Sequence, residues 1–151
     1  MSDDYLVVVT RDPSHVPTAE AQRRVADVLS RLAPNAEDST VQTSAEIQLF
    51  DCGENLERIL CPRCCAEIST DWWHERLDDD EKGAGFQLAP HELPCCGGTV
   101  TLNELSYDWP QAFGRFRWEV MNPDIGDLSD ADKSALEAAA GCELVVIRQH
   151  I

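Results

Sequence analysis

The sequence has few basic residues. It contains 12 Lys+Arg against 28 Asp+Glu, which gives a formal net charge of -16. Because a field of this sign repels phosphate backbones and anionic lipid, nucleic acids and membrane surfaces are unfavourable partners. The same field attracts a basic protein, so we expect a protein partner of basic character, although acidity can also serve only to keep a chain soluble.

Long apolar segments are also missing. No apolar run approaches the roughly 20 residues that a membrane-spanning helix needs. The opening "MSDDYLVVVT" carries acidic residues where a signal peptide has basic ones, and its apolar stretch is too short for such a peptide. We therefore expect a cytoplasmic protein. In that reducing compartment the seven cysteines are thiols, which argues against a disulfide framework and favours metal binding or catalysis.

Familiar catalytic signatures are not found. The sequence has no H-E-x-x-H motif, no deaminase pairing of H-x-E with P-C-x-x-C, and no phosphate-binding GxxxxGK[ST] loop. These absences favour a protein that acts by binding rather than by catalysis.

Regular elements are indicated at both ends of the chain. Residues 5–10 form an apolar run typical of a strand buried on both faces. Thr18 caps a helix with apolar residues at helical spacing up to residue 32, and residues 45–49 alternate as a half-buried strand. The last third repeats this order: an alternating strand at 115–120, a helix from the Ser129 cap to Gly141, and a strand at 143–150.

Without the middle of the chain, the order is strand, helix, strand, strand, helix, strand. This order predicts an α+β fold, a ferredoxin-like βαββαβ sandwich with both helices on one face of a single sheet. Residues 1–51 and 111–151 then form the sandwich domain. Residues 52–110 form an inserted cysteine-rich module between the second and third strands.

Two close pairs of cysteines lie in this module. "CPRC" contains Cys61 and Cys64, and "PCCGG" contains Cys95 and Cys96. A Cys-x-x-Cys turn places two sulfurs on one side of an ion, proline presets the turn, and glycines allow a tight backbone. The sequence therefore predicts a structural zinc ion held by Cys61, Cys64, Cys95 and Cys96.

Other ligands and other roles remain open at this stage. Adjacent cysteines ligate less often than spaced ones, so His91, His74, Cys65 or Cys52 can replace one member of the second pair. A thioredoxin-type redox pair also uses Cys-x-x-Cys, but a helix directly behind the motif is not evident. Cys52 and Cys142 adjoin sheet segments, where small buried cysteines are common.

Two further stretches of the module have structural interpretations. "DWWHE" places two tryptophans beside His74, either as an interface anchor or, preferably, as a cover for a module with little core of its own. "LDDDEK" lacks calcium-loop spacing, so we expect an exposed acidic loop or a patch that faces a basic partner.

A resemblance is carried by "CPRC" followed by "WW", then "LPCCGGTVTLNEL", "YDWP" and "FGRFRWEVMNP". Over roughly residues 59–123 the chain resembles a group of small uncharacterised bacterial proteins that pair a CPxC turn with a PCCG turn. Some of these carry transporter-ATPase labels, which the missing phosphate loop does not support. The module is also similar to zinc ribbons, in which two such turns clamp one ion. The resemblance implies a structural metal and implies no activity.

These observations favour a non-enzymatic acidic zinc protein that binds a basic protein partner, in the manner of an immunity protein holding a toxin or nuclease inactive. The alternative is a zinc-dependent hydrolase with an open coordination position. It would use Cys61, Cys64 and either Cys95 or His91, with Glu92 or Glu67 as the base. A thiol redox sensor that releases zinc on oxidation is a third hypothesis. The sequence does not indicate an oligomeric state.

Overall fold

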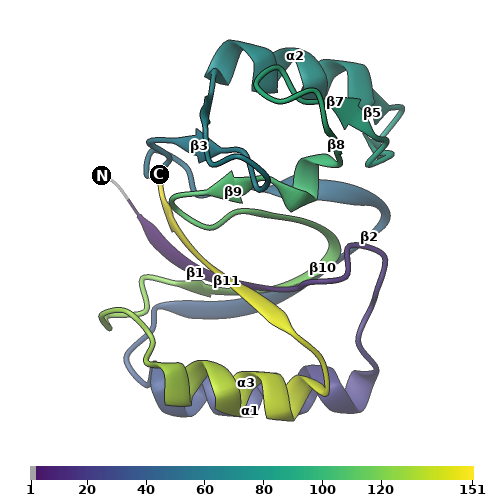
Figure 1. Cartoon of the computed structure of the whole chain (residues 1–151). Helices are drawn as coiled ribbons and strands as arrows, with labels where there is room; N and C mark the ends of the chain where they lie inside the picture. The colour runs from purple at the N-terminus through teal and green to yellow at the C-terminus, as the bar shows by residue number, and fades with distance from the viewer. Residues whose placement is uncertain (1–2) are drawn as a thin grey trace.

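The computed structural model describes residues 3–151 and contains both helices and antiparallel sheets (Figure 1). Four strands form the main sheet: β1 (Asp4–Thr10), β2 (Asp38–Phe50), β10 (Ala112–Met121) and β11 (Leu144–His150). Three α-helices are present in this part of the chain: α1 (Ala19–Leu32), α2 (Thr70–Asp80) and α3 (Asp130–Ala140). The remaining elements, all short, are β3 (Ile59–Leu60), β4 (Glu67–Ile68), β5 (Glu81–Lys82), β6 (Gly85–Phe86), β7 (His91–Glu92), β8 (Thr99–Val100), η1 (Leu102–Glu104) and β9 (Ser106–Tyr107).

The main sheet has the order β11-β1-β10-β2, and every pair in it is antiparallel. Helices α1 and α3 cover one face, and the elements between β2 and β10 lie on the other (Figure 1). Within residues 3–151 no helix combines the length and the apolar character needed to cross a bilayer.

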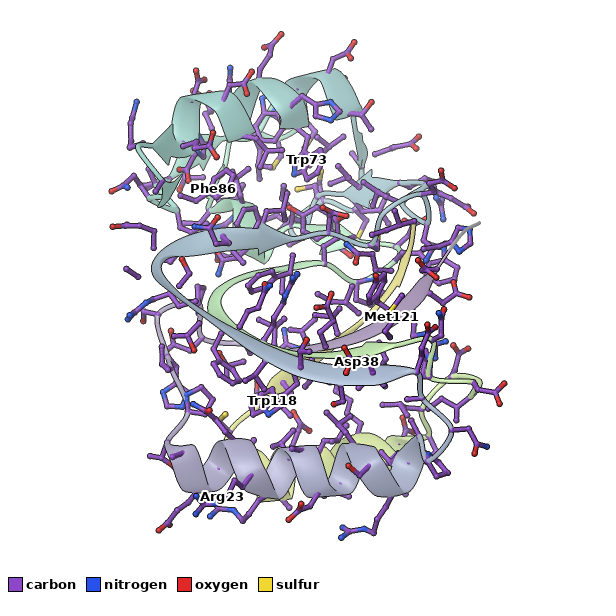
Figure 2. All side chains as sticks on the ribbon, turned by 180° about the vertical axis from the view of Figure 1, so that it is seen from behind. Arg23, Asp38, Trp73, Phe86, Trp118 and Met121 are labelled. Carbon is purple, nitrogen blue, oxygen red and sulfur yellow. The ribbon has the colours of Figure 1, made fainter. Side chains whose placement is uncertain are left out.

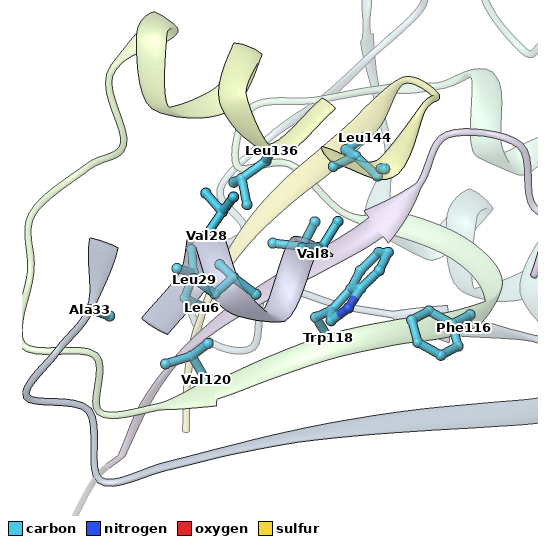
Figure 3. Packing of buried hydrophobic residues seen from close by; sticks show 12 residues of the cluster. Leu6, Val8, Val28, Leu29, Ala33, Phe116, Trp118, Val120, Leu136 and Leu144 are labelled. Carbon is cyan, nitrogen blue, oxygen red and sulfur yellow. The ribbon is translucent and has the colours of Figure 1, made fainter. Parts of the chain in front are cut away.

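The core between sheet and helices follows from strand alternation. Leu6 and Val8 of β1 point toward the helices, whereas Val7 and Val9 lie in a separate cluster on the opposite face. The predicted burial of this strand on both faces is therefore confirmed. Trp118 of β10 packs between the sheet and α1, and its indole N–H donates to the carbonyl of Gln22 at 3.1 Å (Figures 2 and 3).

The predicted helix ends are confirmed. The hydroxyl of Thr18 accepts the N–H of Ala21, and Ser129 with Asp132 forms a reciprocal capping box at the start of α3. Gly141 ends α3 with a φ of 75°, a conformation that glycine adopts without steric cost.

Strand β2 is longer than predicted. It begins at Asp38, not near residue 45, and its first residues pair with the end of β10, for example Asp38 with Met121. This first half is polar and exposed on both faces, so it has no apolar alternation from which to predict a strand. Hydrogen bonds to β10 hold it in the sheet.

The segment "LDDDEK" was predicted to be an exposed acidic loop or a patch that faces a basic partner; most of its residues are exposed, but the prediction of a loop is wrong. Leu77–Asp80 forms the last turn of α2, a helix that the sequence analysis missed, and Asp80 is only 2% exposed. Its carboxylate accepts N–H groups from Gln87, Leu88 and Ala89 at 2.8–3.0 Å. A buried carboxylate with several such donors organises a loop instead of facing solvent.

A second apolar cluster joins the cysteine-rich segment to the sheet. It combines Ile59, Trp73 and Leu93 with Phe113 of β10, and Ile47 and Leu49 of β2 pack against it. Phe86 of β6 meets Phe113 edge-on, with ring centroids 5.2 Å apart (Figure 2). The cysteine-rich segment therefore builds its core on side chains that β2 and β10 supply.

Gly85 brings the β5–β6 hairpin against β2. A Cβ atom at this position would lie 2.5 Å from the Cβ of Glu46 and 2.7 Å from the carbonyl oxygen of Ile47. We predict that Gly85→Ala lowers the free energy of unfolding by about 2 kcal/mol, because neither obstructing atom can move away freely. Thermal and urea unfolding measure this. Gly126→Ala is the control, since no described atom lies within 4 Å of its Cβ. Equal stability of the two variants would contradict the close approach.

Candidate metal centre

The first cysteine turn connects β3 to β4. The N–H of Cys61 donates to the carbonyl of Ala66 at 2.8 Å, and the N–H of Cys65 donates to the carbonyl of Cys61 at 3.0 Å. Cys65 has a φ of 63°, in the left-handed region that favours glycine. This tight turn places Cys61 and Cys64 on the same side of the backbone.

The second turn connects β7 to β8 and has the same hydrogen bonds. The N–H of Leu93 donates to the carbonyl of Gly98 at 2.7 Å, and the N–H of Gly97 donates to the carbonyl of Leu93 at 3.2 Å. Gly97 has a φ of 73°, matching that of Cys65. The two turns are therefore copies of one backbone structure at a constant offset in the sequence.

This correspondence explains the unusual spacing of the second cysteine pair. Pro94 stands where the first turn has Pro62, and Cys96 stands where it has Cys64. Leu93 occupies the place of Cys61, and both side chains are buried, at 2% and 1% exposed. The second turn therefore lacks a cysteine at its first position and carries Cys95 at its third.

The four sulfur atoms of these cysteines converge. The Sγ atoms of Cys61, Cys64, Cys95 and Cys96 all lie within 4.8 Å of one another. Cys64 and Cys95 are 3.4 Å apart, and Cys61 and Cys96 are 3.9 Å apart. A zinc tetrahedron with Zn–S bonds of about 2.3 Å has sulfur–sulfur edges of about 3.8 Å, whereas a disulfide needs about 2.05 Å. The structure thus brings together the four cysteines named from the sequence, and this cluster can hold a metal ion.

The sulfurs of the two turns differ in their hydrogen bonds and in the pKa values that result. The Sγ of Cys61 accepts backbone N–H groups from Arg63 at 3.3 Å and Cys64 at 3.4 Å. These donors, led by that of Cys64, favour the thiolate and lower the pKa of Cys61 to about 6 against the opposing effect of desolvation. Desolvation of its sulfur, followed by thiol contacts with Cys64 and Cys61, raises the pKa of Cys95 to about 12. Of these two thiols, Cys61 therefore ionises first.

The alternative ligands lie outside this cluster. The Nε2 of His91 is 3.1 Å from the buried Oδ1 of Asp80. Cys52 is completely buried, its Sγ 3.4 Å from Oε1 of Gln111, and burial raises its pKa to about 11, as expected for a structural cysteine. The ring of His74 packs beside that of Trp73, and the side chain of Cys65 is exposed.

The Asp80–His91 contact was not predicted from the sequence, because no motif indicates it. Trp73 fits the predicted cover: it is 6% exposed, and its indole N–H donates to the Tyr107 hydroxyl at 3.0 Å. The repeat of the turns was detectable in the sequence, because aligning "CPRCCAEI" with "LPCCGGTV" matches Pro62 with Pro94 and Cys64 with Cys96.

Comparison with family models, curated proteins and solved structures found no match to this chain. The resemblance to small bacterial proteins therefore stays a prediction. The convergent four-cysteine cluster is compatible with its zinc-ribbon-like part.

Substitution of Cys65, the fifth cysteine of the two turns, tests whether this residue is a metal ligand. We predict that Cys65→Gly keeps the metal content and stabilises the protein by up to about 1 kcal/mol, because the left-handed backbone is strained for residues with a Cβ. Cys65→Ala keeps the strain, removes the thiol and also keeps the metal. Metal analysis and thermal unfolding provide the measurements. Loss of metal in both variants would identify Cys65 as a ligand.

Substitution of Leu93 tests whether it occupies the same place in the second turn as Cys61 does in the first. We predict that Cys95→Ala weakens tetrahedral thiolate binding of cobalt, and that adding Leu93→Cys restores it by supplying a sulfur at the first position. The double variant remains less stable than the wild type, since shortening a buried leucine costs about 2 kcal/mol or more. Cobalt absorption spectra and metal stoichiometry report the result.

Leu93→Ala/Cys95→Ala is the matched control, because it has the same packing loss without the new thiol. If this control bound cobalt as strongly as Leu93→Cys/Cys95→Ala does, positions 61 and 93 would not be equivalent.

Proposed function

We propose that this chain is a non-enzymatic zinc protein whose cysteine module presents an acidic surface to a basic partner protein. The observation that carries the proposal is the convergence of four sulfur atoms, which is a complete ligand set for zinc. Soft thiolates favour zinc over magnesium, calcium or manganese. With four protein ligands no coordination position is left for a reactive water, so the metal is structural.

A structural ion suits the place where the sulfurs meet. The strands that flank both turns are two residues long, and the apolar side chains behind them belong to a cluster shared with the main sheet. Such short elements bury too little surface to hold themselves together. Metal binding supplies the missing folding free energy.

We infer that the main sheet with α1 and α3 is a ferredoxin-like sandwich formed by residues 1–51 and 111–151, and that residues 52–110 are an inserted module. The strand order β11-β1-β10-β2 and the placement of both helices on one face support this assignment (Figure 1). The insertion then places the module on the face opposite the helices.

Helix α2 is the outermost element of the module (Figure 1). It buries Trp73 and Asp80, and its exposed residues include Asp71, Glu75 and Asp78. Glu81 follows directly and is also exposed. We call these four carboxylates the α2 acidic face. Three of them project from α2 at helical spacing and the fourth follows its last residue, so they form a negative surface on an already acidic protein.

A basic residue partly neutralises one side of this helix. Arg76 lies 3.5 Å from Glu75 and 3.0 Å from Asp79, and its guanidinium stacks over Trp72. Among the described residues no ion pair joins Asp71, Asp78 or Glu81 to a basic side chain. These carboxylates are therefore available to lysine or arginine side chains of a partner.

The proposed partner is a basic toxin or nuclease that this chain holds inactive. Complementary charge accelerates the encounter and selects basic proteins over others. An acidic surface can occupy the site where a basic nuclease binds its phosphate backbone.

The experiment compares two double variants that remove the same charges. Asp78→Asn/Glu81→Gln alters the α2 acidic face, and Glu20→Gln/Asp27→Asn alters exposed carboxylates on α1. We predict that immobilised wild-type protein and the α1 variant retain a basic protein from a native extract, while the α2 variant retains at least about tenfold less. The retained protein is then purified, and its affinity is measured at increasing salt.

Screening by salt must weaken the binding if charge carries it. The proposed partner class would be contradicted if affinity for the retained protein did not fall as salt rises, or if the α2 and α1 variants retained it equally. Zinc analysis of the same preparations tests the structural part independently: substoichiometric metal in protein that is folded and fully retains the partner would rule out a structural zinc.

A further inference from the structure

A cavity of about 580 Å³ lies between the cysteine module and the main sheet. The module side is formed by the first cysteine turn, η1 and β9, and the sheet side by β10, β11 and the end of β1. Binding sites for small molecules have this size and often lie where two structural units meet. The cavity is separate from the sulfur cluster and from the α2 acidic face.

The cavity walls combine apolar and basic side chains. Pro110 and Val145 supply accessible apolar surface, and Arg11 and Arg63 lie at the border of the cavity. The lining contains two arginines and one acidic residue, Glu104, and a rim glutamate pairs with Arg11, so basic and acidic side chains balance here although the chain has 28 acidic and 12 basic residues. The cavity therefore repels an anion less than the rest of the acidic surface does.

The surrounding structure fixes the position of Arg63. Its Nε and Nη2 atoms donate to the carbonyl of Thr99 at 3.3 and 3.0 Å, so the side chain crosses from the first cysteine turn to the second. Gly98 makes this crossing possible, because a Cβ there would lie 2.9 Å from the Cδ of Arg63. Arg63 is therefore preorganised at the cavity.

The carboxylates near the cavity are already engaged. The Oε1 of Glu104 accepts the N–H and the hydroxyl of Thr101 at 2.9 and 2.6 Å, and these bonds lower the pKa of Glu104. Glu143 lies 3.2 Å from Arg11 on the exposed rim. An incoming anion therefore competes with Glu143 for Arg11, whereas Arg63 donates only to a carbonyl.

Gln111 lines the cavity and carries a buried polar atom that has no hydrogen-bond partner among the described residues. This residue is 7% exposed, and its Oε1 accepts the backbone N–H of Cys52 at 3.2 Å. Its amide nitrogen is buried and has no hydrogen-bond partner in the described structure. A buried donor without an acceptor is unfavourable by about 1–3 kcal/mol.

From these observations we propose that the cavity binds a small organic anion with an apolar body, such as an aromatic carboxylate or sulfonate. The apolar group packs against Pro110 and Val145, and the anionic group lies toward Arg63 and Arg11. This inference does not depend on the proposed partner protein.

Anilinonaphthalene sulfonate is the probe for a first test, because it joins an apolar ring system to an anion and fluoresces when it leaves water. We predict saturable binding to the folded, metal-loaded protein at one site per chain, and displacement by benzoate but not by benzylamine. Arg63→Gln weakens binding about tenfold, as expected for the loss of a charged hydrogen bond. Arg23→Gln on the distant helix α1 removes the same charge and leaves binding unchanged (Figure 2).

A filling variant locates the site. Ser106 is exposed and lines the cavity, so Ser106→Trp occupies it without removing a core side chain. We expect this variant to keep the near-ultraviolet circular dichroism of a folded protein and to lose the probe. Unchanged probe affinity in Ser106→Trp, equal losses in Arg63→Gln and Arg23→Gln, or equal displacement by benzoate and benzylamine would each overturn the proposal. If Ser106→Trp does not fold, the arginine pair and the competitors still decide.

Discussion

Convergence of two identical backbone turns is the constraint on which the cysteine module depends. Each turn closes with the same pair of backbone hydrogen bonds and passes through a left-handed residue, Cys65 in one and Gly97 in the other. This geometry fixes where the side chains at each position point, whatever their identity. The sulfurs meet because the two turns face each other, and the apolar cluster behind Cys61 and Leu93 holds them in that relation.

Charge is distributed unevenly around the two cysteine turns. The outer surface of α2 carries carboxylates, whereas the cavity beneath the first turn is bordered by Arg11 and Arg63. Arg63 belongs to the first cysteine turn as well as to the border of the cavity, because it lies between Cys61 and Cys64 in the sequence and reaches across to the second turn. The turn that orders the sulfurs therefore also orders one of the two arginines at the cavity.

Local signals made part of this structure predictable. Capping residues such as Thr18 and Ser129 and the alternation around Trp118 are short-range features, and each lies where it was expected. The Cys-x-x-Cys spacing indicated Cys61 and Cys64, and the proline and glycines that flank Cys95 and Cys96 indicated the second pair. The first half of β2 has no apolar pattern, since pairing with β10 alone keeps it extended. Asp80 was predicted to be exposed because no local sequence pattern indicates that its carboxylate accepts three backbone N–H groups from a later loop.

The apolar cluster that Phe113 shares between sheet and module would link occupancy of the proposed metal site to the whole fold. If the sulfurs separate, the side chains behind the turns lose their packing, and β2 and β10 lose partners on one face. The unfolded population of a chain decides how readily cellular proteases degrade it. Through this one shared cluster, supply of the metal would set the lifetime of the protein and not merely the order of one small module.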